Sequence, residues 1–393
     1  MPWKFASAIG ERTRFVRAAL QQHQPFAALC REFGISRRTG YKWCHRFQQN
    51  GPAGLQLRSR RPRTTPTRLT KRWQQRIRYA RQRRPHWGAK KIHARWRRQF
   101  PRTRLPAVRT ITQWLPKLCP QRRRRRRHTR RGPQLELPPL TQPTAPNEVW
   151  TADFKGFFRT ADGARCDPLT GRDLCSRFLL AVRVLPHQRH AAVRRVFLGL
   201  FRRHGLPKVI RVDNGSPFGS TAAWGLSTLS VWWRTLGIAV EYIRPGHPEE
   251  NGSHEQMHRE LKRDTARPPA ARPPAQQRRS DRWRRDYNTA RPHEALGGRY
   301  PADHYHRSRR RYRGVQPIRY PRGANVRRVR HNGEIKWQGR LRFIGEPFVG
   351  QPLALRRQMP GVYTVYFQTL LLGTLHDRDA GGLRPSKPRR TKK

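Results

Sequence analysis

The sequence predicts a multidomain protein in which all-α units at the N-terminus precede a central α/β domain and a small C-terminal β-barrel. A length of 393 residues exceeds that of one typical domain. Apolar residues are spaced as in amphipathic helices up to about residue 118, and strand-like alternation begins at Asn147. Segments rich in Arg and Pro separate these regions, as expected of linkers.

Residues 1–58 contain a predicted helix-turn-helix. An apolar face runs from Phe26 to Phe33, Gly34 follows as a helix C-cap, and Ser36 caps the next helix. In that second helix, Trp43, Cys44 and Phe47 are expected to face inward, as is Gly40, where a larger residue should pack better. The outward face would lie in a DNA major groove and carries Arg37, Arg38, Tyr41, Lys42 and His45. An ordinary helical hairpin with a solvated basic face is the alternative.

A second helical unit is predicted over residues 67–118, and it could be another DNA-binding helix-turn-helix. Residues 119–146 form an Arg- and Pro-rich linker. Its basic run, expected to be disordered and to follow DNA phosphates without reading bases, begins with Arg122, Arg123, Arg124, Arg125, Arg126 and Arg127.

The charge of the chain indicates a polyanionic partner. Lys and Arg total 87 against 23 Asp and Glu, a net charge of +64. Such a charge repels itself unless a polyanion neutralises it, and the excess of Arg favours nucleic acid over an anionic membrane surface. The five cysteines lack zinc-binding spacing, and no apolar signal core or membrane-spanning stretch is found. We therefore expect a cytoplasmic, DNA-associated protein.

The region 147–305 alternates between predicted strands and helices. Strands are expected at 149–158, 178–185, 208–212 and 238–243, and helices at 189–204, 222–236 and 252–265. Short strands between Gly turns at 320–378 predict the barrel, and residues 379–393 form a basic, disordered tail.

Three acidic residues at the ends of predicted elements form the candidate catalytic site. Asp153 lies in the strand VWTADFKGFF, Asp213 closes the strand VIRVDNGSPF, and Glu255 lies in the first turn of the helix after RPGHPEENG. Carboxylates suit Mg²⁺, and a pair of such ions can activate an attacking oxygen and stabilise a leaving one. Taken singly, the acids could be a surface strand residue, a turn residue and a favourable helix-terminal charge.

The segments WTADFKG, IRVDNGSPF and RPGHPEENGSHEQMHRELK resemble the DDE core of insertion-sequence transposases and retroviral integrases, and YNTARPHEALGGRYPADHY resembles the segment that closes it. The resemblance spans nearly the whole chain. It implies an RNase H-like integrase core, an SH3-like barrel after it, and Mg²⁺- or Mn²⁺-dependent cleavage and strand transfer at terminal repeats, with two ions per active site. The partners implied are double-stranded DNA, as terminal repeats and target, and further copies of the chain.

Carried over by position, the resemblance makes Asp153, Asp213 and Glu255 the metal ligands and catalytic residues. Glu255 is preferred to Glu249 and Glu250 because Lys262 follows it by two helical turns, where it could hold a substrate phosphate. The spacing of 42 residues from Asp213 to Glu255 is longer than is usual between the corresponding acids of the family that the chain resembles. This difference indicates an insertion around GSTAAWGLSTLSVWW.

One motif competes with this interpretation. His254 to His258 fits H-E-x-x-H, the zinc metalloprotease signature with Glu255 as general base. That interpretation leaves Asp153, Asp213 and the charge unexplained, so we expect both histidines to face DNA or solvent. Two further alternatives are a non-catalytic DNA-binding protein derived from a transposase and a ribonuclease with the same core.

Overall fold

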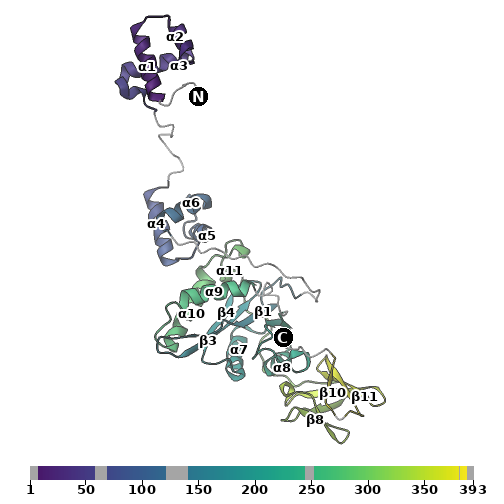
Figure 1. Cartoon of the computed structure of the whole chain (residues 1–393). Coiled ribbons are helices and arrows are strands. Elements are labelled where there is room, and N and C mark those ends of the chain that lie inside the picture. The colour runs from purple at the N-terminus through teal and green to yellow at the C-terminus, as the bar shows by residue number, and fades with distance from the viewer. Residues whose placement is uncertain (1–7, 58–68, 121–139, 244–251, 380, 387–393) are drawn as a thin grey trace. The chain divides into compact units, whose positions relative to one another are not determined.

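The computed structural model describes residues 8–57, 69–120, 140–243, 252–379 and 381–386 (Figure 1). The chain forms two compact units, Met1–Arg68 and Leu69–Lys393. The Arg run of the linker and residues 387–393 of the expected basic tail lie outside the described residues, but the expectation of disorder from residue 379 is wrong, because Arg384–Pro385 pairs as a strand with residues 373–374.

The first unit is a bundle of short helices. It contains α1 (Ala8–Gln21), α2 (Phe26–Glu32), α3 (Arg37–Asn50) and the 3₁₀ turn η1 (Gly51–Leu55). The predicted turn is confirmed, because Gly34 has a positive φ of 64° and the Ser36 hydroxyl accepts a hydrogen bond from the Thr39 amide. Phe15 and Trp43 lie in the core of the bundle.

Gly40 on α3 is required by the packing of this bundle, so the expectation that a larger residue would fit better is wrong. A Cβ there would lie 2.8 Å from Cys30 Sγ and 2.9 Å from the Cζ atoms of Phe15 and Phe26. The absence of a side chain lets α3 pack closely against α1 and α2.

The second unit begins with α4 (Lys71–Arg83), α5 (Ala89–Gln99) and α6 (Val108–Leu118). The predicted apolar faces are confirmed, since Ile77, Ile92, Trp96 and Ile111 are buried together. Basic side chains of this helical group form ion pairs with acids further along the chain. The pairs are Arg84–Asp286, Lys90–Glu294, Lys91–Glu260 and Arg98–Asp303.

A mixed sheet forms the centre of the second unit. Its strands are β1 (Val149–Phe154), β2 (Phe158–Arg159), β3 (Arg165–Asp173), β4 (Leu179–Leu185), β5 (Val209–Val212) and β6 (Ala239–Tyr242). The order is β2-β3-β1-β5-β6, and β4 also pairs with β3. Strands β1, β5 and β6 are parallel, whereas β3 is antiparallel to β1 and to β4.

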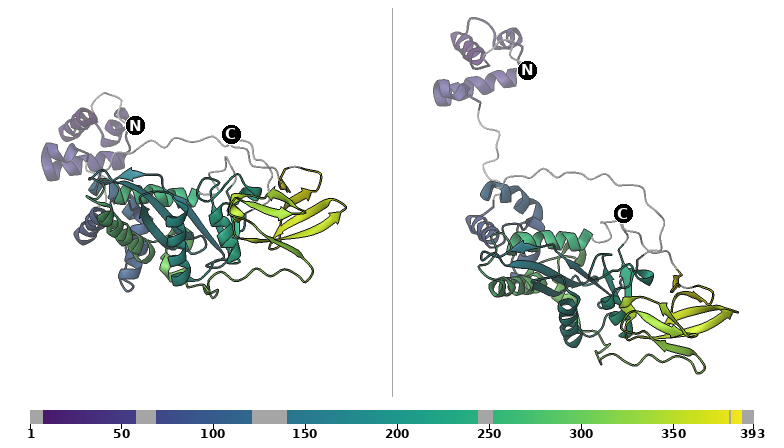
Figure 2. Two further views of the ribbon diagram at one scale, coloured as in Figure 1. Left: turned by 90° about the horizontal axis from the view of Figure 1, so that it is seen from below. Right: turned by 60° about the horizontal axis from the view of Figure 1, so that its bottom comes forward.

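Helices cover both faces of this sheet (Figures 1 and 2). On one face, α7 (His190–His204) and α8 (Thr228–Thr235) share a core with the sheet that includes Trp150, Phe201 and Trp233. On the other, α9 (Gly252–Thr265) and α10 (Pro273–Ala290) bury Met257 and Tyr287 against β4. The segment closing this region contains η4 (Glu294–Leu296) and α11 (Pro301–His304).

Most predicted strands and helices of this region are confirmed within a few residues, and α9 has the expected bounds, whereas the helix predicted at 222–236 begins only at Thr228. Strand β3 and helix α10 were not predicted from the sequence. Strand β3 contains Pro168 and buries polar residues such as Asp167, Thr170 and Arg172, so it shows no apolar alternation. The segment that was expected to be an insertion after Asp213 forms η2 (Ala223–Gly225) and α8, and Trp224 Nε1 donates to the Leu371 carbonyl at 2.7 Å.

The C-terminal region is all-β, as predicted. Strands β7 (Asn325–Arg328), β10 (Pro352–Met359), β11 (Val362–Phe367), β12 (Leu370–His376) and β13 (Arg384–Pro385) form one antiparallel sheet. Strands β8 (Glu334–Trp337) and β9 (Arg340–Phe343) form a separate hairpin, and η5 (Glu346–Phe348) follows. Both sheets contribute to one core, and closure into an SH3-like barrel stays a prediction.

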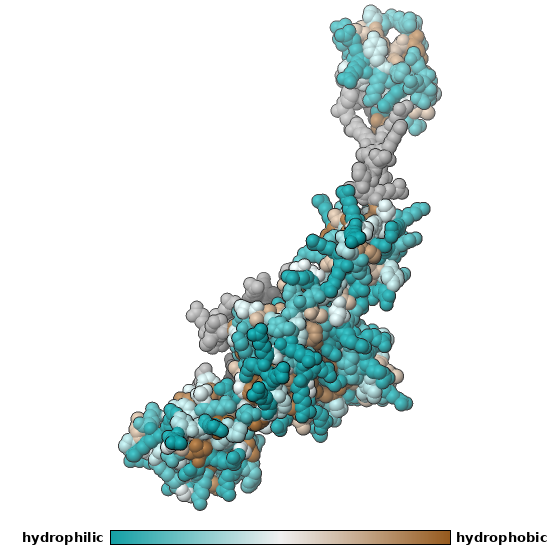
Figure 3. Space-filling model, turned by 180° about the vertical axis from the view of Figure 1, so that it is seen from behind, coloured by the Kyte–Doolittle hydropathy of each residue, from teal (hydrophilic) through white to brown (hydrophobic). Residues whose placement is uncertain are grey.

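Hydrophilic residues cover most of the described surface on the face shown in Figure 3. In the part of the chain that the structure describes, no helix is long and apolar enough to cross a bilayer.

Candidate active site

Asp153 and Asp213 occupy equivalent positions on neighbouring parallel strands. The register of β1 and β5 pairs Thr151 with Arg211, and two more residues along each strand lead to Asp153 and Asp213. Neighbouring strands lie about 4.8 Å apart. The parallel register therefore puts both carboxylates at the carboxyl-terminal edge of the sheet.

The turn after β5 shapes the surroundings of Asp213. Asn214 Nδ2 donates to the Ile243 carbonyl at 2.6 Å, which ties the turn to the end of β6. The Asp213 residue is exposed by surface area, yet nearby protein atoms crowd its carboxyl. This desolvation raises the pKa of Asp213, and the backbone N–H of Gly215, which donates to the carboxylate, opposes the rise.

Glu255 lies in the first turn of α9, as predicted, and its side chain is exposed. The adjacent His254 is buried and anchors this turn on β1, because its Nδ1 lies 2.9 Å from the Thr151 hydroxyl. Glu255 thus begins the helix that packs beside the strand of Asp153. Lys262 is half-buried two turns further along α9.

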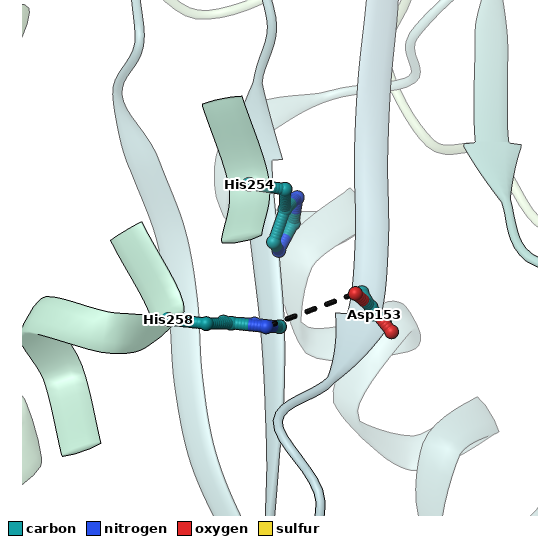
Figure 4. Close-up of side chains that lie close together, drawn as sticks. All are labelled: Asp153, His254 and His258. Atoms are coloured by element: carbon teal, nitrogen blue, oxygen red, sulfur yellow. Dashed lines mark ion pairs between the residues drawn. The ribbon is translucent and has the colours of Figure 1, made fainter. Parts of the chain in front are cut away.

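The three acids do not form a single compact ligand cluster in this structure. Among the described residues, one group of three potential ligands has all its ligand atoms within 4.8 Å of one another, and it contains Asp153, His254 and His258 (Figure 4). Asp213 and Glu255 do not belong to that group.

The expectation that His254 and His258 face DNA or solvent is wrong, because both are buried. Their Nε2 atoms each lie 2.7 Å from the hydroxyl of Thr170 on β3. His258 Nδ1 lies 3.7 Å from Asp153 Oδ2. The i, i+4 spacing on a helix that also buries Met257 and Leu261 was the available signal for this burial, since His254, Met257, His258 and Leu261 share one helical face.

Burial keeps the two imidazoles neutral. It lowers the pKa of His258 to about 3, with smaller contributions from the charges of Lys155 and Arg172. It also lowers the pKa of His254 well below its usual value. Both ring nitrogens of His254 have hydrogen-bond partners, so the zinc-protease arrangement would require breaking one of these bonds.

The predicted DNA-reading face of α3 is on the surface of the first unit. Its five residues are all exposed: Arg37, Arg38, Tyr41, Lys42 and His45. Tyr41 stacks on Phe26 with ring centroids 4.3 Å apart, which fixes the ring at the surface. The basic run from Arg122 to Arg127 lies outside the described residues.

Known domain families match most of the chain. An integrase core domain matches residues 143–248, and a second integrase core model matches 236–301. A helix-turn-helix domain matches 11–63, and a homeodomain-like domain matches 39–115. The C-terminal domain of the IS481 family transposases matches 324–380.

Individual proteins show the same likeness. The insertion element IS407 uncharacterized 31.7 kDa protein of Burkholderia multivorans is 31% identical over 180 residues, 46% of this chain and 62% of that protein. The insertion element IS476 uncharacterized 39.2 kDa protein of Xanthomonas euvesicatoria is 27% identical over 252 residues, 64% of this chain and 69% of that protein. The HTLV-2 integrase catalytic core domain in complex with magnesium aligns with 42% of this chain and 100% of its own, with 16% identity and a TM-score of 0.31.

The chain spans about three-fifths of the length of the first of these relatives. The matching domains occur in the order that the sequence predicts, with the helix-turn-helix regions first, the integrase core next and a transposase C-terminal domain last. The chain therefore contains an integrase core domain between helix-turn-helix domains and a transposase C-terminal domain, and it is similar to proteins of insertion elements.

Proposed function

We propose that this protein is a DNA transposase, a polynucleotidyl transferase that cleaves 3′ ends at the terminal repeats of an insertion sequence and joins them to target DNA. One observation carries the proposal. Asp153 and Asp213 extend the register of two adjacent parallel strands, and Glu255 begins the helix anchored beside them. This arrangement supports a shared site for the three acids at one edge of an RNase H-like sheet.

The residues at this edge fit a pair of Mg²⁺ or Mn²⁺ ions. The raised pKa of Asp213 marks a carboxyl whose negative charge is poorly compensated by its surroundings, and a neighbouring cation would stabilise the charged form. Asp153, Asp213 and Glu255 would hold the ions through oxygen atoms, which hard divalent cations prefer. Bound there, the ions would activate the attacking oxygen and stabilise the leaving oxygen. Lys262 would hold a DNA phosphate.

The regions outside the catalytic core would recognise DNA. In this proposal the domain of residues 1–58 reads the terminal repeat with α3, and the linker of 119–146 and the β-barrel of 320–378 contact the DNA backbone. The ion pairs of α5 with Glu260 and Glu294 support a role for the 67–118 domain in attaching these regions to the catalytic core of 147–305. Joining two element ends requires an assembly of at least two copies.

The test compares Asp153→Asn, Asp213→Asn and Glu255→Gln with the wild type. Each variant is assayed for Mg²⁺-dependent cleavage of DNA that carries the element's ends, and for binding of the same DNA. We expect cleavage to fall by at least about 10³-fold, because each change removes a ligand of the catalytic ions, while binding is retained. Asp281→Asn, on α10 and not one of the three proposed ligands, is the matched control and should cleave normally.

Three outcomes would reject the proposal. Normal cleavage by all three variants would exclude this active site. A wild type that binds the element's ends without nicking them would indicate a non-catalytic DNA-binding protein, and preferential turnover of RNA–DNA hybrids would indicate a ribonuclease.

A further inference from the structure

The hydroxyl of Thr170 connects the strand of Asp153 to both buried histidines. Thr170 Oγ1 donates to the Asp153 carbonyl at 3.0 Å. The same oxygen lies 2.7 Å from His254 Nε2 and 2.7 Å from His258 Nε2. A hydroxyl has one proton and two lone pairs, so these three contacts use its whole hydrogen-bonding capacity.

This contact pattern assigns the protons on the two imidazoles. Since the Thr170 proton goes to the carbonyl, both histidines must donate to Thr170 through Nε2–H. In a neutral ring the other nitrogen, Nδ1, is then an acceptor. His254 Nδ1 accepts from the Thr151 hydroxyl at 2.9 Å. His258 Nδ1 instead faces Asp153 Oδ2 at 3.7 Å.

Two atoms that both carry lone pairs therefore face each other at the edge of the site. Their separation of 3.7 Å exceeds that of a hydrogen bond. It is a distance that one metal ion can bridge, because each ligand bond to such an ion is about 2.0–2.2 Å long. The Asp153 side chain is 19% exposed, so an ion could reach this position from solvent.

We propose that His258 Nδ1 is an additional metal ligand, which binds together with Asp153 one of the divalent ions of the proposed active site. Thr170 orients the His258 ring by accepting a hydrogen bond from Nε2–H. A histidine that binds a metal through one ring nitrogen commonly donates from the other in this way. His254 is a positioning residue that holds Thr170 and β1 in place. The proposal rests on the proposed function for the presence of the ions, and it adds a nitrogen to a set of oxygen ligands.

A nitrogen ligand changes which metal the site prefers. Imidazole favours later transition metals, whereas carboxylates and water are sufficient for Mg²⁺. The site should therefore bind Mn²⁺ more tightly than Mg²⁺, and the difference should depend on His258.

The test uses Mn²⁺ and the full chain. Pulsed electron paramagnetic resonance detects the nuclear spin of a nitrogen bound to Mn²⁺, and titration of free Mn²⁺ gives the affinity. We compare the wild type with His258→Gln, whose amide can still donate to Thr170 but has no atom at the position of Nδ1. His204→Gln is the matched control, because it also replaces a buried histidine, on α7, that does not belong to this group of ligand atoms.

We expect a nitrogen signal in the wild type and in His204→Gln, and none in His258→Gln. Loss of a direct ligand should weaken Mn²⁺ binding by at least about tenfold. Removing a residue that only hydrogen-bonds to a metal ligand already lowers metal affinity by about 10- to 100-fold. Circular dichroism of each variant checks that it folds. Bound Mn²⁺ with no nitrogen signal in the wild type, or a signal that persists in His258→Gln, would overturn the inference and leave the proposed function intact. If Asp153→Asn changes neither Mn²⁺ binding nor cleavage, the proposed function itself fails.

Discussion

Replacing Gly40 by alanine separates what helix propensity predicts from what tertiary packing predicts. Alanine is more favourable than glycine by about 1 kcal/mol in a helix interior, so propensity alone predicts that Gly40→Ala stabilises the first unit. The structure predicts the opposite, because the added Cβ would lie 2.8–2.9 Å from three side-chain atoms.

The size of the effect follows from these contacts. Carbon atoms pack best about 3.5–4.0 Å apart, so each contact would be too short by about 0.6 Å or more. Phe15 is fully buried and Cys30 is 2% exposed, so neither can move away freely. Overpacking of this kind costs up to about 3 kcal/mol. After the propensity gain, we expect a net destabilisation of about 2 kcal/mol.

Hydrogen exchange measured by mass spectrometry can follow this helix separately from the rest of the chain. Amides of α3 should exchange about 30-fold faster in Gly40→Ala, since 1.4 kcal/mol corresponds to a factor of ten. Gly199→Ala is the matched control, because Gly199 lies inside α7 with nothing within 4 Å of the added Cβ. That change should slow exchange in α7. Slower exchange of α3 in Gly40→Ala would refute the packing argument.

Three further results are expected. Removing Arg291, which pairs with the nearly buried Glu260, should destabilise the second unit by about 2 kcal/mol, because Glu260 then keeps only its longer ion pair with Lys91 at 3.8 Å. Lys90→Ala in the exposed pair with Glu294 should cost under about 1 kcal/mol, and equal midpoints in urea for the two variants would contradict this. Burial lowers the pKa of His204 to about 4, so the unfolded chain binds the proton first as the pH falls below about 6.5, and stability should drop by about 2 kcal/mol between pH 7.5 and pH 5. Denaturation of His204→Gln, measured at both pH values, should show a smaller drop. Affinity for DNA should fall steeply with salt, by a logarithmic slope of about −0.9 for each neutralised phosphate, and a salt-independent Kd would argue against backbone binding.

Local sequence patterns were sufficient to predict several parts of this protein. The Gly34 turn and the Ser36 cap end and begin helices through contacts within a few residues, and α9 was predicted with its observed bounds. The positions of the acids at element ends could be predicted for the same reason. Their arrangement in space could not, because the register that aligns Asp153 with Asp213 joins strands about sixty residues apart.

Only the tertiary structure decided which polar groups are buried. Strand β3 is central in the sheet although its sequence shows no apolar alternation, and its Thr170 hydroxyl offers hydrogen bonds to His254 and His258 that make their burial possible. The need for glycine at position 40 likewise comes from side chains on α1 and α2. Sequence periodicity predicts which face of an element is apolar. It does not predict which distant residue will hydrogen-bond to a buried polar group or fill the space beside a glycine, because that contact forms only when the elements pack together.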